Sequence, residues 1–220
     1  VATLVNAYLV QGLPYPKSSR LFNIQYAPPG TSFPPPGMTF PRDLEKLDWG
    51  SLDDVIELPI SWDLDVFNLG GEPHPLAANG AWVTPGYMEG FGVKPVLGRG
   101  FVPDDFKSGR PAVAMISHRM WQTRFAGDPA ILGRHFDAYM NDRPDEVEAF
   151  TVIGVLPERY WHTNAYTEVM APLRGPSYPY MVRVRPGVPA EIAAQRINTL
   201  IRSGNPALPP QWRADLLSTH

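Results

Sequence analysis

The run 90–160 constrains the fold most, because short apolar segments alternate in it with Gly and Pro turns. Its continuous apolar stretch at 112–116 is typical of a buried strand. Ser117 follows directly and precedes 118–125, where apolar residues recur at helical spacing, so we expect a helix capped by this serine. A further apolar run at 149–156 predicts another strand. Strand, helix and strand within one stretch indicate a domain that mixes α and β structure.

Similar patterns elsewhere extend this prediction to an α+β fold. The predicted strands are 20–26, one or two within 53–69, 77–83, 112–116, 135–139, 149–156 and 180–184. The predicted helices are 40–49, a short one from Pro85 with Thr84 as its N-cap, 118–125, and 188–202 with Val188, Ile192, Ile197, Leu200 and Ile201 on its apolar side. The predicted loops include a Pro-rich segment at 28–37 and a polar turn at 141–146.

Charge and composition exclude several classes of protein. The 220 residues carry 19 basic and 22 acidic side chains, which gives a net charge of -3 at pH 7. This balance provides no basic surface for DNA, RNA or an anionic membrane. The sequence has no cysteine, so disulfides, thiolate metal sites and cysteine nucleophiles are excluded. No run reaches the roughly 18 apolar residues that a membrane-spanning helix needs.

Ser117 and His118 form a Ser–His pair, which invites interpretation as a hydrolase. Adjacent residues on a helix point to different sides, however, and no G-x-S-x-G elbow surrounds any serine. Ser117 is therefore better explained as a helix N-cap. The sequence predicts no catalytic residue.

Other polar clusters lack the spacing of a metal or cofactor site. The carboxylate pairs Asp53–Asp54 and Asp104–Asp105 are not part of a D-x-D-x-D-G pattern. No H-x-x-x-H spacing relates four of the histidines, which are His74, His118, His135 and His162. The glycines in 90–100 do not form a phosphate loop, and Pro95 removes a backbone amide that such a loop would use. We therefore expect solvated carboxylates and tight turns, with no metal and no cofactor.

Four polar aromatic residues gather after the predicted strand 149–156, and they are the candidate contacts with a ligand or partner. They are Tyr160, Trp161, His162 and Tyr166. Such rings can stack on a sugar or an apolar ligand, or can anchor a protein interface. Ordinary packing in the core or at an edge of the fold is the simpler alternative.

The segment 1–10 is largely apolar and carries no charged side chain. Its composition leaves two interpretations open. It is either a buried helix or strand, or the trailing end of a membrane helix.

Ten different short sequence motifs occur along the chain in a specific order. They are Leu13-Pro14-Tyr15-Pro16, Arg20-Leu21, Asp48-Trp49, Asn68-Leu69-Gly70, Val93-Lys94-Pro95 with Arg99, Trp121 with Phe125, Gly127-Asp128-Pro129, Leu132-Gly133-Arg134, Val152-Ile153-Gly154-Val155 and Arg185-Pro186-Gly187. As an ordered set, they resemble the MacB-like periplasmic core domain of bacterial ABC transporter permeases. Each motif alone is weak, but the resemblance covers nearly the whole chain.

The resemblance implies an α+β domain of two subdomains between the first and second membrane helices of a permease. A porter-like α/β sandwich would be built from both chain ends, 1–76 and 174–220. A smaller α/β module, 77–173, would be inserted between them. The segment 1–10 would then be the end of the first membrane helix.

The resemblance also implies a mechanical function on the extracytoplasmic, periplasmic face of the bacterial inner membrane. The domain would transmit ATP-driven motion of the membrane helices to an extracytoplasmic substrate or partner, and would not be an enzyme. ATP hydrolysis would occur on a separate cytoplasmic subunit or domain. The implied partners are the membrane helices of the same permease, the ATPase, a second permease copy and an extracytoplasmic adaptor. Without its membrane segments, the domain is expected to be monomeric or weakly dimeric. The alternative is a secreted ligand-binding module that uses the four aromatic residues.

Overall fold

The computed structural model describes residues 15–27, 44–70, 76–140, 143–158, 160, 166–175, 177–206, 208, 210 and 212–219. The predicted loop 28–37 and the apolar segment 1–10 lie outside these residues. The contacts divide the chain into two compact units, which are Val1–Ser61 with Pro176–His220, and Trp62–Gly175. Within the described part of the chain, no helix is both long enough and apolar enough to span a membrane.

The first unit is built around a four-stranded antiparallel sheet. Its strands are β1 (Leu21–Ala27), β2 (Ile56–Ile60), β10 (Met181–Val184) and β11 (Arg213–Ser218), in the order β11-β1-β10-β2. Strand β1 confirms the prediction made from the alternation at 20–26. Residues near both chain ends therefore lie side by side in one sheet, as Phe22 is paired with Ser218.

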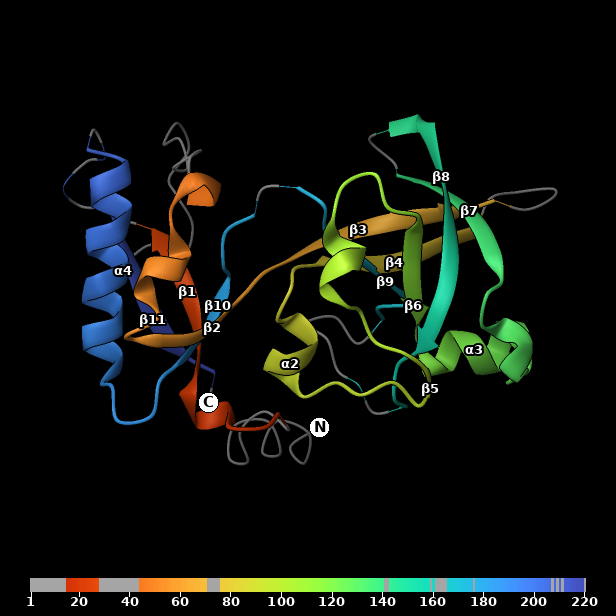
Figure 1. Ribbon diagram of the computed structural model, residues 1–220, viewed down its shortest axis with the longest axis horizontal. Helices are drawn as coiled ribbons and strands as arrows, with labels where there is room; N and C mark the ends of the chain where they lie inside the picture. The colour runs from red at the N-terminus through yellow and green to blue at the C-terminus, as the bar shows by residue number, and fades with distance from the viewer. Residues whose placement is uncertain are drawn as a thin grey trace, which may run out of the picture. The chain divides into compact units, whose positions relative to one another are not determined.

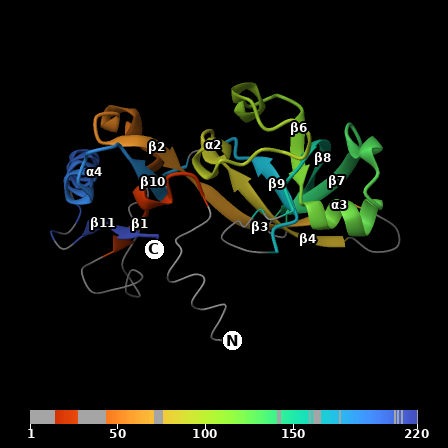
Figure 2. The same ribbon diagram turned by 90° about the horizontal axis from the view of Figure 1, so that it is seen from below.

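Helix α4 (Ala190–Gly204) covers this sheet, and Figures 1 and 2 show it beside the strands. Ala193, Ile197 and Ile201 are buried at a spacing of four residues and pack into one core with β1, β10 and β11. The predicted apolar side is therefore wrong at Ile192, which is 45% exposed. The small Ala193 occupies the buried position instead.

The predicted helix 40–49 is wrong in the residues that the structure describes. Two short 3₁₀ helices, η2 (Leu44–Lys46) and η3 (Trp49–Leu52), stand there instead, and η1 (Ser18–Arg20) precedes β1. Leu44 and Leu52 are buried in the core of the first unit. Trp49 donates a hydrogen bond from Nε1 to the carbonyl of Leu44 at 2.9 Å, which ties the two short helices together.

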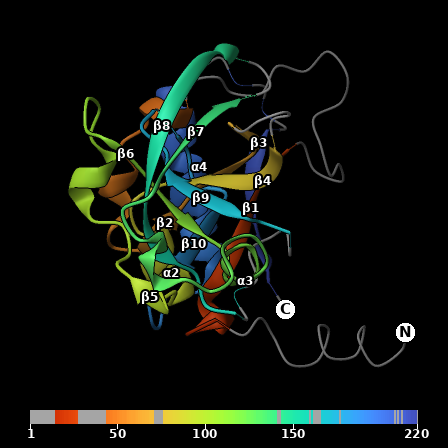
Figure 3. The same ribbon diagram turned by 90° about the vertical axis from the view of Figure 1, so that its right-hand side faces the viewer.

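The second unit contains a seven-stranded mixed sheet. Its strands are β3 (Trp62–Leu69), β4 (Leu76–Val83), β5 (Leu97–Gly98), β6 (Ala112–Ile116), β7 (His135–Met140), β8 (Arg143–Val155) and β9 (Val169–Pro172). The strand order is β5-β8-β6-β9-β4-β3-β7, and β7 also pairs with β8. That extra pairing closes six of the described strands into a ring, and Figures 1 and 3 show β8 between β6 and β7.

The long strand β8 makes this closure possible. Its residues 150–155 pair in parallel with β6, and its residues from Arg143 to Thr151 pair with β7 in an antiparallel hairpin. The polar turn predicted at 141–146 is therefore too long, because the strand already begins at Arg143. The strand runs through Asp145 and Glu146 despite their low strand propensity, at a place where its register with β7 shifts.

Two α-helices belong to the second unit. Helix α3 (His118–Phe125) follows β6 as predicted, and Met120 points into the core inside the ring. Helix α2 (Tyr87–Phe91) begins later than predicted, because Gly86 at φ 88° provides the turn before it and Thr84 does not cap it. Short 3₁₀ helices, η4 (Pro103–Phe106) and η5 (Pro129–Ile131), lie in the connections.

The unit boundary lies at residues 61/62 and 175/176, whereas the sequence placed the subdomain limits at 76/77 and 173/174. The difference arises from β3, which pairs with β4 over its full length from Trp62 to Leu69. The expected α+β class is confirmed by one antiparallel and one mixed sheet with few helices.

Candidate functional site

Ser117 caps helix α3, as the sequence predicts. Its Oγ accepts a hydrogen bond from the backbone N–H of Met120 at 3.1 Å. His118 lies edge-on to Trp121, with ring centroids 5.5 Å apart. The hydroxyl therefore satisfies an otherwise unpaired amide of the first helical turn, as its position before the helix predicts.

A small cavity of about 60 Å³ lies beside this helix start. It is lined by Ser117, His118, Arg119, Leu156, Pro157, Glu158, Tyr160, Tyr166, Thr167 and Glu168. Pockets for organic ligands have volumes of about 300–1,000 Å³. This cavity has room for a few water molecules and not for a sugar or drug-sized ligand.

The structure places two of the four predicted aromatic contacts at this small cavity. Tyr160 donates a hydrogen bond from its hydroxyl to Tyr87 Oη at 2.6 Å, so Tyr160 is held against α2. Tyr166 is 64% exposed. Trp161 and His162 lie outside the described residues. The part of this aromatic group that is described therefore combines one anchored ring with one exposed ring.

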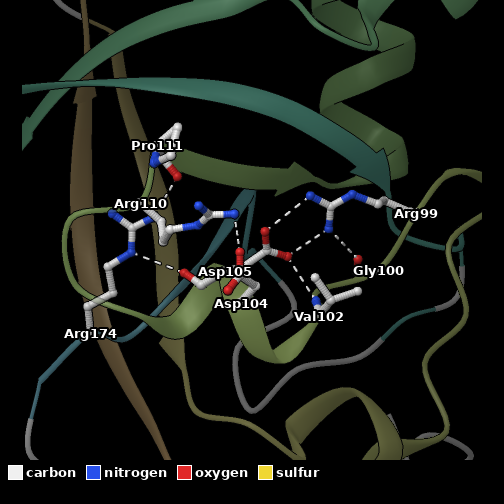
Figure 4. Close-up of polar contacts among 8 residues, drawn as sticks. All are labelled: Arg99, Gly100, Val102, Asp104, Asp105, Arg110, Pro111 and Arg174. Carbon is white, nitrogen blue, oxygen red and sulfur yellow. Dashed lines mark hydrogen bonds and ion pairs between the residues drawn. The ribbon is translucent and has the colours of Figure 1, made fainter.

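Asp105 of the second carboxylate pair is engaged in a compact polar network, shown in Figure 4. Arg99 donates from both guanidinium nitrogens to the two oxygens of Asp105, at 2.7 and 3.1 Å. The backbone N–H of Val102 donates to the same carboxylate at 2.8 Å. The 3₁₀ helix η4 positions Asp105 for these contacts, because Pro103 begins it and turns the chain back toward Arg99.

Electrostatics keeps Asp105 ionised. Its partial burial raises the pKa of the carboxyl group, but the hydrogen bonds from Arg99 and from the Val102 amide outweigh burial, and the pKa ends below its ordinary value. The same hydrogen bond raises the pKa of Arg99. A carboxylate held so firmly in its charged form is poorly suited to general acid catalysis near neutral pH.

Arg174 joins this network from a distant part of the sequence. Its Nε donates to the carbonyl of Asp105 at 3.1 Å, and Nη2 donates to the carbonyl of Pro111 at 2.6 Å. It also forms an ion pair with Glu148 at 3.4 Å. Arg174 thus fastens the connection between β5 and β6 to the end of β9. No motif in the sequence signals this residue, since its partners are mostly backbone carbonyls.

The remaining acidic candidates also make structural contacts in the residues described. Asp104 forms ion pairs with Lys107, at 2.9 Å, and with Arg110. Asp54 pairs with Arg196 at 3.1 Å, and the carbonyl of Asp53 accepts a hydrogen bond from Arg185. Across the described part of the chain, no three His, Asp or Glu side chains cluster in a way that could hold a metal ion, while His74 and His162 lie outside it.

The glycines of the predicted tight turns are explained by packing. Gly98 has φ 75°, and a Cβ atom there would overlap the carbonyl oxygen of Ile153. A Cβ atom on Gly154 would overlap the carbonyl oxygen of Arg99. Both residues allow β5 to approach β8 closely.

Together these observations define an α+β domain in two units. In one unit, an antiparallel sheet brings together strands from near both chain ends. In the other, contacts of arginine with a carboxylate and with backbone carbonyls stabilise the ring of strands. Comparison with known families identifies the family to which this domain belongs. Residues 5–200 match the MacB-like periplasmic core domain, and the chain belongs to that family. The resemblance noted in the sequence is thereby confirmed.

Solved structures share this fold at low sequence identity. The extracellular domain of the noncanonical ABC-type transporter YknZ from Gram-positive bacteria is 17% identical, with a TM-score of 0.61, 88% of this chain covered and 98% of that chain. The periplasmic region of MacB from Actinobacillus actinomycetemcomitans is 15% identical, with a TM-score of 0.61 and coverages of 92% and 90%.

A third structure, a domain of a putative permease protein from Porphyromonas gingivalis, is 17% identical, with a TM-score of 0.57 and coverages of 93% and 92%. Likeness at these identities establishes the fold alone. No curated protein matches the chain significantly.

Proposed function

We propose that this chain is the extracytoplasmic domain of an ABC transporter permease, and that it transmits ATP-driven motion of membrane helices to an extracytoplasmic substrate or partner. The observation that carries the proposal is the family match over residues 5–200. The fold shared with the extracellular domain of YknZ and the periplasmic region of MacB supports it. The proposed location is the periplasmic face of the bacterial inner membrane.

The first unit is suited to receive motion from membrane helices. Strand β1 begins near Leu21 and β11 ends near Ser218, and the pairing of Phe22 with Ser218 brings these two points together. Because β1 and β11 are antiparallel neighbours, the chain enters and leaves the sheet at the same end. Helices attached before β1 and after β11 would therefore act on one edge of one sheet.

The proposed partners are those that membership of the family implies. They are the membrane helices of the same permease, an ATPase that hydrolyses ATP on a separate cytoplasmic subunit or domain, a second permease copy and an extracytoplasmic adaptor. We infer that the sheet made from both chain ends is a porter-like subdomain and that the intervening residues form the inserted module. The isolated chain is proposed to be monomeric or weakly dimeric.

A labelling experiment tests the proposed location. The chain contains no cysteine, so a single Cys in a full-length parent protein freed of other cysteines reports on one position. Glu191→Cys places the thiol on the exposed face of α4, and a membrane-impermeant maleimide should label it in intact spheroplasts. Ile197→Cys is the matched control, because its buried side chain should stay unlabelled. Labelling of Glu191→Cys only after permeabilisation would contradict the proposal.

The alternative is a secreted ligand-binding module that uses Tyr160, Trp161, His162 and Tyr166. The observation that favours it is the 64% exposure of Tyr166 beside the small cavity. Fractionation of the native parent protein distinguishes the two candidates, because a secreted module would be found free of the membrane. In either case, these four residues stay proposed contacts, and Tyr166→Ala should weaken binding of a partner that uses them.

A further inference from the structure

A second cavity, of about 400 Å³, lies within the second unit. Asp63 and Asp65 of β3, Trp82 of β4, Phe150 and Glu148 of β8, and Arg174 are among the residues that line it. Its volume falls within the range of about 300–1,000 Å³ that is typical of small-molecule pockets. Neither the predicted aromatic contacts nor the proposed mechanical function uses this cavity.

The cavity lies where the ring of strands opens. Alternate residues of a strand face the same side, and Phe67 and Leu69 of β3 are buried in the core. Asp63 and Asp65 continue the same face of β3 beyond that core, and Asp63 is the cross-strand partner of Trp82. The mouths of closed β-sheets are recurrent ligand sites, because the strands hold the lining residues rigidly.

Aromatic rings form the apolar side of the cavity. Trp82 is partly buried, with its ring centroid 5.0 Å from that of Phe67 and 6.1 Å from that of Phe150. Phe150 also stacks on Phe136, with ring centroids 5.6 Å apart, so the aromatic side of the cavity is supported by a further ring. The indole is therefore held in place and offers a surface for an apolar or cationic group.

The charge of the cavity is unbalanced. Arg174 forms an ion pair with Glu148 at 3.4 Å and donates its other hydrogen bonds to backbone carbonyls. Asp65 accepts hydrogen bonds from its neighbour Val66 N–H, at 2.7 Å, and from Trp82 Nε1, at 3.4 Å. Within the described residues, no Lys, Arg or His forms an ion pair with Asp63 or Asp65. Two negative charges thus remain beside the indole.

We infer that this cavity binds a small organic cation with an apolar body, held between Trp82 and the carboxylates of Asp63 and Asp65. An anion would be repelled by the two carboxylates. A neutral apolar molecule would desolvate them without compensation. A bare metal ion would leave the aromatic wall unused. An organic cation satisfies both surfaces, by ion pairing and by a cation–π contact.

The test uses two probe ions of the same size and shape but opposite charge. Isothermal titration calorimetry of the 220-residue chain with tetraphenylphosphonium measures binding of the cation, and titration with tetraphenylborate measures binding of the anion. We expect the cation to bind with a Kd of 1 mM or tighter, roughly the weak end of small-ligand binding, and the anion to bind at least about tenfold more weakly. Raising the salt concentration should weaken binding of the cation.

Matched variants assign the binding to this cavity. Asp63→Asn with Asp65→Asn removes two charges but keeps side-chain oxygens that can accept the hydrogen bonds from Val66 and Trp82. Asp53→Asn with Asp54→Asn removes the same charge from the surface of the first unit. The first double variant should bind tetraphenylphosphonium at least about tenfold more weakly, since each lost ion pair costs a factor of a few. The second should bind it unchanged.

A second readout covers the case in which a variant is less stable. The indole Nε1–H resonance of Trp82 should shift when tetraphenylphosphonium is added to the unaltered chain, and should not shift with tetraphenylborate. The inference is overturned by equal affinity for the two ions, by undiminished binding in Asp63→Asn with Asp65→Asn, or by a Trp82 resonance that does not respond to the cation. None of these measurements depends on transport, so the result is separate from the proposed function.

Discussion

At the scale of single residues, Asp105 is a point at which several polar contacts of the second unit converge. Its carboxylate accepts two hydrogen bonds from Arg99 and one from the amide of Val102, and its carbonyl accepts one from Arg174. The residue is 8% exposed. Asparagine in its place would keep one acceptor oxygen, but its NH2 group would face a second donor, from Arg99 or the Val102 amide, and the guanidinium would lose its counter-charge in a site that water reaches only partly.

Asp105→Asn should therefore lower the free energy of unfolding by about 1–3 kcal/mol at pH 7, the range for losing a partly buried charged hydrogen-bond partner. Chemical denaturation measures the change. The neighbouring Asp104→Asn is the matched control and should have little effect, because the ion pairs of Asp104 are solvent-exposed. Equal losses in the two variants would contradict the role of the network.

The stability of the unaltered chain and that of Asp105→Asn should also depend differently on pH. The folded-state pKa of Asp105 is below its ordinary value, so its contribution is complete above the unfolded-state pKa of about 3.9. It is lost as the pH falls from there through the folded-state pKa. The difference in stability between the unaltered chain and Asp105→Asn should thus shrink when unfolding is measured at pH 3 instead of pH 7. A difference that grows at pH 3 would contradict this assignment.

Gly98 tests a second feature at this scale, the close approach of β5 to β8. Gly98→Ala adds a Cβ atom that overlaps the carbonyl of Ile153, at φ 75°. Gly109→Ala adds one at φ 77° in open space. We expect a cost of about 1 kcal/mol for Gly109→Ala from backbone strain alone, and at least about 2 kcal/mol for Gly98→Ala. Thermal unfolding of the two variants should separate the cost of backbone strain from that of steric overlap. Equal losses of stability would contradict the close packing of Gly98 against Ile153.

At the scale of elements, the sequence predicts best where local signals are strong and agree. The run 112–116 is apolar throughout and forms the buried strand β6, and Ser117 then caps α3 as expected. Helix α4 was found by its spacing, but its buried side was partly misassigned. An isoleucine counts for more than an alanine in a hydrophobic pattern, although the structure buries Ala193 and leaves Ile192 exposed.

Ile192 and Ile197 therefore form a matched pair on α4. Ile197→Ala should destabilise the chain by about 2–5 kcal/mol, because its fully buried side chain leaves a cavity against the sheet. Ile192→Ala removes the same atoms from a position that is 45% exposed and should cost about 0.5 kcal/mol. Denaturant unfolding compares the two variants. Comparable losses would contradict the orientation of the helix.

At the scale of the whole molecule, the arrangement of the strands depends on contacts between distant residues. Period-two patterns indicate the strands, but no local pattern indicates that β7 pairs with both β3 and β8 and so closes the ring. The same holds for Arg174, whose carbonyl partners leave no trace in the sequence. The carboxylates of the second cavity were equally hidden, since Asp63 and Asp65 meet Trp82 only through the register of β3 and β4.

The pairing of β1 with β11 gives the proposed mechanical function its physical basis. Strands near both chain ends are hydrogen-bonded neighbours in one sheet, so a displacement of attached membrane helices would reach the domain through this pair. The domain itself would supply no chemistry to ATP hydrolysis. Hydrolysis and transport should therefore be separable by changing this domain alone.

The most direct test measures both activities in a full-length transporter in which residues 15–219 are replaced by a flexible linker. ATPase activity and substrate transport are assayed side by side in reconstituted vesicles, with the unaltered transporter as the reference. We expect ATP hydrolysis to persist while transport is lost. Transport that survives the replacement would contradict the proposed mechanical function.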